Sequence, residues 1–353
     1  MTVPTLTGIT ARRITSARLT TRVLFSGADS GTPVLFLHGN LSSATFFEEL
    51  MLALPPGFRG IAPDHRGYGD AEPDKKIDAT RGLGDLADDA AALLDALHID
   101  KAHIVGHSLG GAVVWRLLLD HPQRFLSVTQ IAPGSPYGFG GSKDAEGTPC
   151  WEDSAGSGAG LVNQTFAGLL AKGDRSTDTP LFSPRIVMKR MWRPGFVPAR
   201  EEDILSSMLS IHCGPQDYPG DFVASPNWPG IAPGVWGPNN ALSPKYQGDI
   251  SRLYHIQPKP PLLWIRGSLD SSVSDESMAD MGTLGKMGLI PGYPGEAVYP
   301  PQPMLQQTRA VLEKYKAAGG HYEEVVIEDA AHVPYMEQPE AFNRAFFAHL
   351  ARA

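Results

Sequence analysis

Short apolar runs alternate with longer stretches of helical periodicity along the first 131 residues. Residues 85–97 and 109–119 repeat apolar side chains at helical spacing, and aspartates in the first turn of the former suit a helix N-terminus. The apolar runs predict strands at residues 22–26, 34–37, 60–63, 102–105 and 125–131. This alternation predicts an α/β fold whose mostly parallel sheet carries helices on both faces.

The alternation stops at residue 132, and the chain is crowded with Gly, Pro, Ser and Trp as far as residue 246. Helical spacing returns only at residues 160–170 and 200–209, and a structureless loop of this length would be abnormal in a compact domain. The segment also contains most of the tryptophans, which are Trp151, Trp192, Trp228 and Trp236. Because disordered linkers are poor in aromatics, we expect an inserted cap domain at residues 134–245.

Regular patterns resume after the insertion. Residues 261–266 and 323–327 read as strands, and residues 304–318 and 339–350 read as helices. The stretch between residues 278 and 303 is rich in Met, Gly and Pro, and we expect it to form a flap beside the cap. Residues 1–133 and 246–353 are therefore expected to form one core domain.

Composition narrows the range of partners. Of the 353 residues, 42% are hydrophobic and 19% charged, which is enough apolar material for a large core. The net charge of −8 disfavours nucleic acid or anionic lipid as the main partner, so a small-molecule substrate is expected. The sequence does not fix the oligomeric state, and a homodimer is one option.

The chain has neither a long apolar run nor an apolar segment near the N-terminus. No run approaches the length that crosses a bilayer, and residues 1–22 mix Thr, Arg and Ser. We therefore expect a cytoplasmic protein without a membrane span. Cys150 and Cys213 are expected to be reduced thiols, with a single bridge between them as the alternative.

The strongest chemical motif is the sequence GHSLGG at residues 106–111. An apolar strand precedes it and a helical pattern follows, so Ser108 is expected on the sharp strand-to-helix turn that presents a nucleophile. Gly106 and Gly110 would let neighbouring backbone approach this turn. The N–H of Leu109 would then point at a developing oxyanion.

A second motif, LHGN at residues 37–40, follows an early strand. The loop after such a strand commonly supplies the other backbone donor of an oxyanion hole, and by position that donor is the N–H of Asn40. His38 is expected to be a structural histidine that holds the loop, rather than the catalytic base.

His332 is the candidate general base. It lies in a loop after the last predicted strand, and Ser, Asp and His occur in the expected order along the chain. Five competing histidines lie in a strand, at the elbow, at a helix end or near the cap, and these are His103, His107, His121, His212 and His255. None of them occupies a late loop after a strand.

The acid that orients the histidine is expected to be Asp270. It follows the strand at residues 261–266, at the carboxyl end where a triad acid belongs. Asp275 is close enough in sequence to compete, and Glu276 is a weaker rival. The loop after the strand at residues 125–131 contains no carboxylate, which favours Asp270.

Together these motifs resemble the α/β-hydrolase superfamily. The matching pieces are LHGN at 37–40, DHRGYG at 64–69, GHSLGG at 106–111, RGSLD at 266–270 and AHVPYMEQPE at 331–340. The resemblance implies an α/β-hydrolase fold with a mostly parallel sheet of about eight strands, an inserted cap and hydrolysis through an acyl-enzyme on Ser108. It implies no cofactor and no metal. One departure is Ala71, where relatives usually carry a serine, and that serine is not catalytic.

The expected reaction is hydrolysis of a carboxylic ester or a lactone with a bulky hydrophobic or aromatic group. The residues expected to contact the substrate are His107, Trp192, Trp228, Trp236 and Val333. Each aromatic residue of the cap has the alternative role of filling the cap's own core. Cleavage of a C–C bond or an amide by the same triad remains an alternative, as in an aminopeptidase, and a ligand receptor without turnover is a third hypothesis.

Overall fold

The computed structural model describes residues 3–352 and contains an eight-stranded sheet. Its spatial order is β1-β2-β4-β3-β5-β6-β11-β12. The strands are β1 (Thr10–Thr15), β2 (Thr20–Ser26), β3 (Thr32–Leu37), β4 (Phe58–Pro63), β5 (Ala102–His107), β6 (Phe125–Ile131), β11 (Leu262–Gly267) and β12 (Tyr322–Ile327). Strand β2 runs antiparallel to β1 and β4, and the neighbours from β4 to β12 are parallel. The prediction of a mostly parallel eight-stranded α/β-hydrolase sheet is confirmed.

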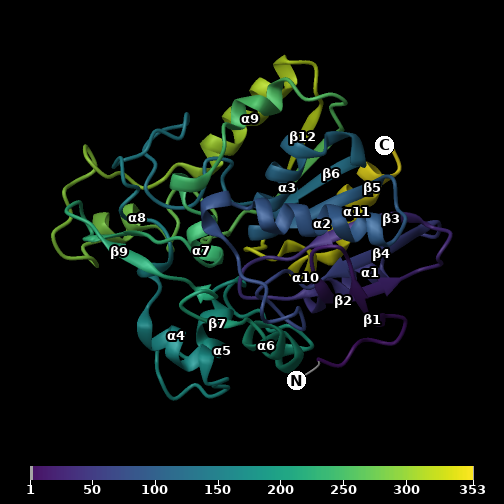
Figure 1. The fold of residues 1–353 in the computed structure, drawn as a ribbon, viewed down its shortest axis with the longest axis horizontal. Helices are drawn as coiled ribbons and strands as arrows, with labels where there is room; N and C mark the ends of the chain where they lie inside the picture. The colour runs from purple at the N-terminus through teal and green to yellow at the C-terminus, as the bar shows by residue number, and fades with distance from the viewer. Residues whose placement is uncertain (1–2, 353) are drawn as a thin grey trace.

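Helices cover both faces of this sheet. Figure 1 shows α2 and α3 in front of the strands and α11 behind them. The helices around the sheet are α1 (Glu48–Leu52), α2 (Gly84–Ala96), α3 (Leu109–Asp120), α9 (Met304–Ala317), α10 (Pro334–Glu337) and α11 (Pro339–Leu350). Phe36 of β3 is fully buried and packs on Phe47 and on Phe346 of α11, with ring centroids 5.2 and 6.3 Å apart.

The register of the sheet brings four predicted loops to one edge. Leu37 of β3 lies beside Gly106 of β5, and Gly267 of β11 lies beside Ile327 of β12. Each of these residues is at the carboxyl end of its strand, and parallel strands present these ends at the same edge. The loops with the predicted oxyanion donor, nucleophile, acid and base therefore all leave the sheet on one side.

The segment at residues 134–245 lies between β6 and β11 in the chain and holds short helices and two-residue or three-residue strands. They are α4 (Gln164–Ala171), α5 (Pro184–Lys189), α6 (Glu201–Leu209), α7 (Pro238–Ala241), β7 (Cys213–Gly214), β8 (Tyr218–Pro219), β9 (Phe222–Ala224) and β10 (Ile231–Pro233). We call this stretch the inserted segment. In Figure 1 its helices lie beside and below the sheet, away from α9 and β12.

Three details differ from the sequence-based expectations. The helix expected at 160–170 begins only at Gln164, because the Asn163 side chain caps it by accepting from the N–H of Phe166. The flap expected between 278 and 303 contains a further helix, α8 (Met281–Lys286). Strand β1 was not predicted, since its side chains are almost all exposed and show no apolar run.

Helix α6 of the inserted segment is tied to the core by an ion pair. Arg200, next to its first turn, contacts the buried carboxylate of Glu48 in α1 at 3.1 Å. The same carboxylate oxygen accepts from the N–H of Leu6 at 2.6 Å.

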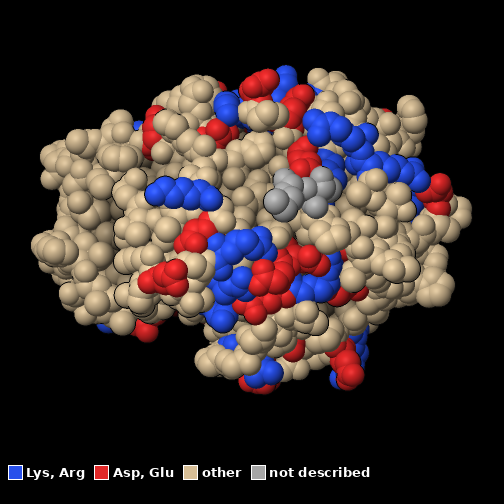
Figure 2. Space-filling view, turned by 90° about the horizontal axis from the view of Figure 1, so that it is seen from below, with Lys and Arg blue, Asp and Glu red and all other residues tan. Residues whose placement is uncertain are grey.

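Figure 2 shows acidic and basic side chains intermingled on the face seen from below, so charges there are arranged as mixed clusters.

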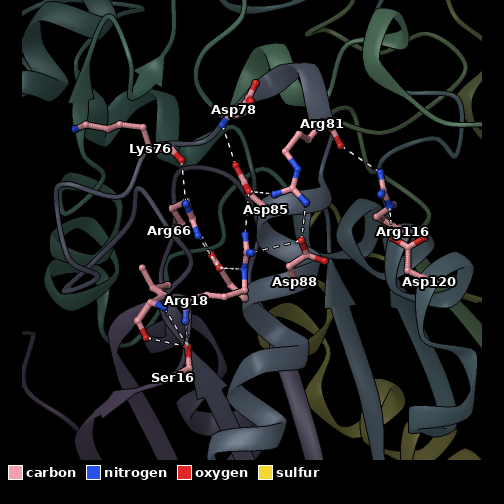
Figure 3. A network of polar contacts seen from close by, with 12 residues as sticks. Ser16, Arg18, Arg66, Lys76, Asp78, Arg81, Asp85, Asp88, Arg116 and Asp120 are labelled. Atoms are coloured by element: carbon pink, nitrogen blue, oxygen red, sulfur yellow. Dashed lines mark hydrogen bonds and ion pairs between the residues drawn. The ribbon is translucent and has the colours of Figure 1, made fainter.

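A second polar network anchors the first turns of α2 (Figure 3). Arg66 makes two hydrogen bonds to the carboxylate of Asp89, at 2.7 and 2.8 Å, and Arg18 reaches both Asp85 and Asp89 at 3.0 Å. Arg81 pairs with Asp88 at 2.6 Å. Because Arg66 belongs to the DHRGYG motif, this network fixes the loop after β4 against α2.

Two smaller expectations concern the membrane and the cysteines. Over residues 3–352, no helix combines the length and the apolar character that a bilayer span requires. Cys150 and Cys213 are both free and half-buried, so the alternative of a bridge between them is wrong. Burial raises the pKa of the Cys150 thiol to about 12, which keeps it protonated at neutral pH.

Candidate active site

Ser108 stands between β5 and α3 in strained backbone geometry. Its φ is 54° and its ψ is −113°, a backbone conformation that residues other than glycine rarely adopt. A Cβ at Gly106 would lie 2.5 Å from the carbonyl oxygen of Gly110, and a Cβ at Gly110 would overlap the carbonyl of Leu37. The two glycines thus allow the close approach that the sharp turn needs.

The loop after β3 is held in place by a buried histidine. Nδ1 of His38 lies 2.8 Å from the carbonyl oxygen of Gly39 and its Nε2 accepts from the N–H of His65 at 3.0 Å. Burial lowers the pKa of His38 to about 3, so the ring is neutral and suits both contacts. This geometry matches the structural role expected for His38.

The side chain of Asn40 joins this loop to two other parts of the fold. Its Oδ1 accepts from the hydroxyl of Tyr68 at 2.8 Å and from the N–H of Leu41 at 3.0 Å. Its Nδ2 donates to Oδ1 of Asn239 in α7 at 3.1 Å. Leu41 follows with a φ of 53°, so the backbone at Asn40 is held by several contacts and by a strained neighbour.

Asp270 and His332 form a buried pair. Nδ1 of His332 lies 2.9 Å from Oδ2 of Asp270, and the side chains are only 7% and 3% exposed. The other oxygen of Asp270 accepts from the N–H groups of Ser272 and Val273 at 2.8 and 3.1 Å. The carboxylate is therefore oriented by its own loop and can fix one imidazole tautomer.

The two rival carboxylates are engaged elsewhere. Asp275 accepts from the N–H of Leu305 at 2.8 Å and so caps the first turn of α9. Glu276 pairs with Lys286 at 3.1 Å. Neither contacts His332, which leaves Asp270 as the carboxylate beside the imidazole.

The loop that carries His332 is fixed by a second buried carboxylate. Oε1 of Glu337 in α10 accepts from the N–H groups of Ala331 and Val333 at 3.0 and 3.3 Å. Its Oε2 accepts from the N–H of Arg193 in the inserted segment at 2.7 Å. Burial raises the pKa of Glu337, and the three N–H donors oppose that shift because they favour the ionised form.

Two cavities meet at Ser108. The first chamber has a volume of about 290 Å³, and its lining includes Ser108, Leu109, Asn40, Arg190 and His332. The second chamber has a volume of about 380 Å³ and shares Ser108, Asn40 and Arg190 with the first. The predicted nucleophile, base and both oxyanion donors thus border one hollow of a size that suits a small molecule.

The predicted oxyanion donors, Asn40 and Leu109, both border the first chamber. Leu109 is the first residue of α3, so its N–H has no carbonyl one turn earlier within the helix to donate to. The positive end of the helix dipole adds to the attraction of negative charge at this point. A tetrahedral oxyanion beside Ser108 could accept from this N–H and from that of Asn40.

The residues expected to contact the substrate lie outside both chambers. Trp192 is buried against Phe46, and Trp228 packs on Tyr299 at 4.9 Å. The backbone of Trp236 forms an isolated antiparallel β-bridge with Asp78. These contacts join the inserted segment to the rest of the fold, and Trp192 also packs on Phe196 within the segment at 5.7 Å, as the alternative role in the cap's own core would have it.

His107 and Val333 are likewise packed behind the site. His107 is 2% exposed, and its Nε2 donates to the carbonyl oxygen of His332 at 2.8 Å. Burial and the nearby His332 hold the pKa of His107 well below its usual range, so the ring is neutral. Val333 is fully buried. Neither chamber includes either residue, or any of the three tryptophans above, among its described lining residues.

Sequence reasoning missed several residues that shape the site. Tyr68 and Glu337 lie inside the motifs DHRGYG and AHVPYMEQPE, so their place in these motifs was a usable signal. Asn239 and Arg190 lie in the irregular inserted segment, where no pattern in the sequence distinguishes them. Their proximity to Ser108 arises only when the inserted segment folds over the edge of the sheet.

Two curated relatives each match about a third of this chain. A putative carbamate hydrolase RutD of Variovorax paradoxus is 38% identical over 106 residues, which is 30% of this chain and 39% of that protein. A 2-hydroxymuconate semialdehyde hydrolase of a Pseudomonas species is 35% identical over 116 residues, which is 32% of this chain and 40% of that protein. The chain thus spans about 40% of the length of these curated relatives.

Solved structures resemble the whole chain at low identity. The carboxylesterase CesB of Bacillus subtilis superposes with a TM-score of 0.59 at 16% identity, over 98% of this chain and 92% of that one. A 2-hydroxy-6-oxo-6-phenylhexa-2,4-dienoate hydrolase of a Rhodococcus species gives a TM-score of 0.58 at 17% identity, over 98% and 99% of the two chains. The family model described as "alpha/beta hydrolase fold" matches residues 32–292. With this match and the eight-stranded sheet, the chain belongs to the α/β-hydrolase fold family.

Proposed function

We propose that the protein is a serine hydrolase that cleaves a carboxylic ester or a lactone through an acyl-enzyme on Ser108. One observation carries this proposal. The strained turn with Ser108 and the buried Asp270–His332 pair come from distant parts of the chain, and Ser108 and His332 border the same chamber. A hydroxyl, an imidazole and a carboxylate in this order form the constellation that activates serine for attack on a carbonyl carbon.

In the proposed reaction, Nε2 of His332 removes the proton from Oγ of Ser108 as the oxygen attacks the carbonyl carbon. The N–H groups of Asn40 and Leu109 stabilise the oxyanion. Asp270 holds the Nδ1–H tautomer and offsets the charge of the imidazolium. The imidazolium then protonates the leaving alcohol, and water activated by the same histidine releases the acid.

The first experiment is labelling with a fluorophosphonate probe, followed by mass spectrometry of the labelled peptide. We expect a label on Ser108, and its loss in Ser108→Ala and His332→Ala. Hydrolysis of an ester and lactone panel should fall by a factor of about 10⁴ or more in both variants. An unlabelled Ser108 in a folded protein would favour a ligand receptor without turnover.

Cleavage of a C–C bond is a second candidate, favoured by the sequence similarity to the 2-hydroxymuconate semialdehyde hydrolase. A vinylogous diketone and an aminoacyl anilide should be assayed beside the esters. Turnover of the diketone at a higher kcat/KM than every ester would replace the ester proposal while keeping Ser108 as the reactive residue.

A further inference from the structure

We infer that the substrate extends to both sides of Ser108, with a hydrophobic alcohol part in the first chamber and an acyl part bearing an oxygen acceptor in the second. This inference rests on the proposed ester hydrolysis and adds to it the chemical class of each half of the substrate. It follows from a difference between the chambers, because the proposed catalytic residues do not border both of them equally.

The two chambers share the predicted nucleophile but not the predicted base. Ser108 and Asn40 border both, whereas His332 and Leu109 border only the first. During acylation the bond from Oγ of Ser108 to the carbonyl carbon forms and the bond from that carbon to the alcohol oxygen breaks. The proton on His332 passes to that alcohol oxygen, so the oxygen must lie within hydrogen-bond reach of the imidazole.

The leaving alcohol therefore belongs to the first chamber. The acyl substituent leaves the tetrahedral carbon in another direction, and the second chamber opens from Ser108 on the side without His332. A volume of about 380 Å³ there gives the acyl part as much room as the 290 Å³ of the first chamber gives the alcohol. A substrate with a bulky group on only one side would leave one chamber unused.

The walls of the first chamber suit a hydrophobic alcohol. Its apolar side chains come from the core loops, from helix α5 and from the turn after α5. Those that line the first chamber and not the second include Leu41, Val187, Met191 and Val273. Burying an aromatic or aliphatic alcohol among them gains about 25 cal/mol for each Å² of apolar surface.

The second chamber also has apolar walls, and it adds side chains with hydrogen-bond donors. Tyr218 is 3% exposed and lines this chamber, and among residues 3–352 no hydrogen bond is found for its hydroxyl. The amide NH₂ of Asn239, whose oxygen is taken by Asn40, also donates to no other described residue. Donors at the chamber wall that have no protein partner can bind an acceptor on the ligand.

A ketone, hydroxyl or carboxylate oxygen on the acyl chain would supply that acceptor. The guanidinium of Arg190 borders both chambers and donates through Nη2 to the carbonyl oxygen of Leu181 at 2.6 Å. This ties Arg190 to the wall between the chambers. Tyr218 and Asn239 are thus the residues proposed to select the acyl group.

The chamber assignment is tested with two variants that fill one chamber each. Val187→Trp narrows the first chamber and Leu161→Trp narrows the second, and neither residue belongs to the proposed catalytic machinery. We expect Val187→Trp to lower kcat/KM at least tenfold for naphthyl acetate and to leave methyl pentanoate within about twofold. Leu161→Trp should show the opposite pattern. Leu289→Trp, at an exposed position, serves as the control.

The donor role of Tyr218 is tested with Tyr218→Phe and two acyl chains of equal length. Methyl levulinate carries a ketone oxygen that methyl pentanoate lacks. We expect kcat/KM to fall about tenfold for the levulinate and to stay within about twofold for the pentanoate. Equal losses on both esters would overturn the donor role, because a packing defect acts on both alike.

The outcomes separate this inference from the proposed function. A reversed pattern, or two variants that act alike on both esters, would overturn the chamber assignment while fluorophosphonate labelling of Ser108 persists. A protein that hydrolyses no ester and leaves Ser108 unlabelled would instead overturn the proposed function itself.

Discussion

The N–H of His332 donates to the carbonyl oxygen of Met191 at 3.0 Å. The backbone of the proposed base is therefore bonded directly to the inserted segment, and Met191 also lines the first chamber. Two residues along, the N–H of Arg193 is bonded to Glu337, which holds the N–H groups on both sides of His332. One short stretch of the inserted segment thus shapes the pocket and positions the base.

This relationship predicts that Glu337 positions His332 without touching substrate. Glu337→Gln keeps the size of the side chain but replaces one acceptor with a donor, so one set of N–H groups loses its partner. We expect kcat to fall by a factor between about 10 and 100, with a smaller change in KM. The measurement is the pH profile of kcat and kcat/KM, whose shape should change when the base is no longer held in place.

Glu340→Gln is the matched control, because Glu340 is an exposed glutamate in the first turn of α11. It should retain full activity and an unchanged pH profile. A Glu337→Gln enzyme with lower stability but wild-type kcat and an unshifted profile would reduce Glu337 to a structural role.

Asp270 and Asp275 should differ sharply when each is changed to asparagine. Asp270→Asn can no longer fix the Nδ1–H tautomer of His332, and we expect a loss of about 10⁴ in kcat/KM. Asp275→Asn leaves the imidazole untouched and weakens only a helix cap, which costs about 1 kcal/mol of stability or less. Steady-state kinetics and thermal unfolding of the pair decide between the two carboxylates, and comparable losses would contradict the assignment.

The buried carboxylate of Asp64 should be a major contributor to stability. It is fully buried, pairs with Arg22 at 3.0 Å and accepts from the N–H groups of Ala44 and Asp70 at 2.9 and 3.0 Å. Asp64→Ala leaves a buried guanidinium without its partner, so we expect a loss of about 3–5 kcal/mol. Urea unfolding measures it, with the exposed Asp74→Ala as control. A loss below about 1 kcal/mol would show that the network is dispensable.

Because two histidines are buried as neutral rings, we expect the free energy of unfolding to fall as the solution becomes acidic. Burial lowers the pKa of His103 and of His349 to about 4, against an ordinary value of 6.5. Between these values the unfolded chain binds protons that the folded protein does not. The stability from keeping these rings neutral is therefore complete above pH 6.5 and is lost as the pH falls toward 4.

The histidine effect is measured by urea unfolding between pH 7 and pH 5, a range in which the ordinary carboxylates stay ionised. Each such histidine contributes a slope of at most about 1.4 kcal/mol per pH unit. His349→Gln should flatten the dependence, whereas His98→Gln, at an exposed position, should leave it unchanged. Parallel curves for His349→Gln and the wild type would contradict the buried neutral ring.

The fold was largely predictable because its signals are local. The strand predicted at residues 125–131 is β6, and the helix predicted at 85–97 is α2 shifted by one residue. Apolar runs and helical spacing act over a few residues and are read directly from the chain. The turn at Ser108 is equally local, since the glycines on both sides of it are what lets the backbone bend there.

The pocket was not predictable in the same way. Trp192, Trp228 and Trp236 were expected to contact substrate because the inserted segment is aromatic, yet their contacts join that segment to residues outside it. An apolar side chain gains similar free energy in a core and in a pocket wall, so composition alone does not separate the two. Asn239 and Tyr218 gave no signal because no pattern in the irregular inserted segment distinguishes them.

The sequence by itself determined the order of strands and helices, the elbow at Ser108 and the loops that carry Asp270 and His332. These depend on backbone sterics and on periodicity, which are properties of neighbouring residues. Only the tertiary structure decided which carboxylate meets the imidazole, which side chains line the two chambers and how Met191 and Glu337 hold the base. Those relationships join residues far apart in the chain, and they exist only once the sheet and the inserted segment have packed together.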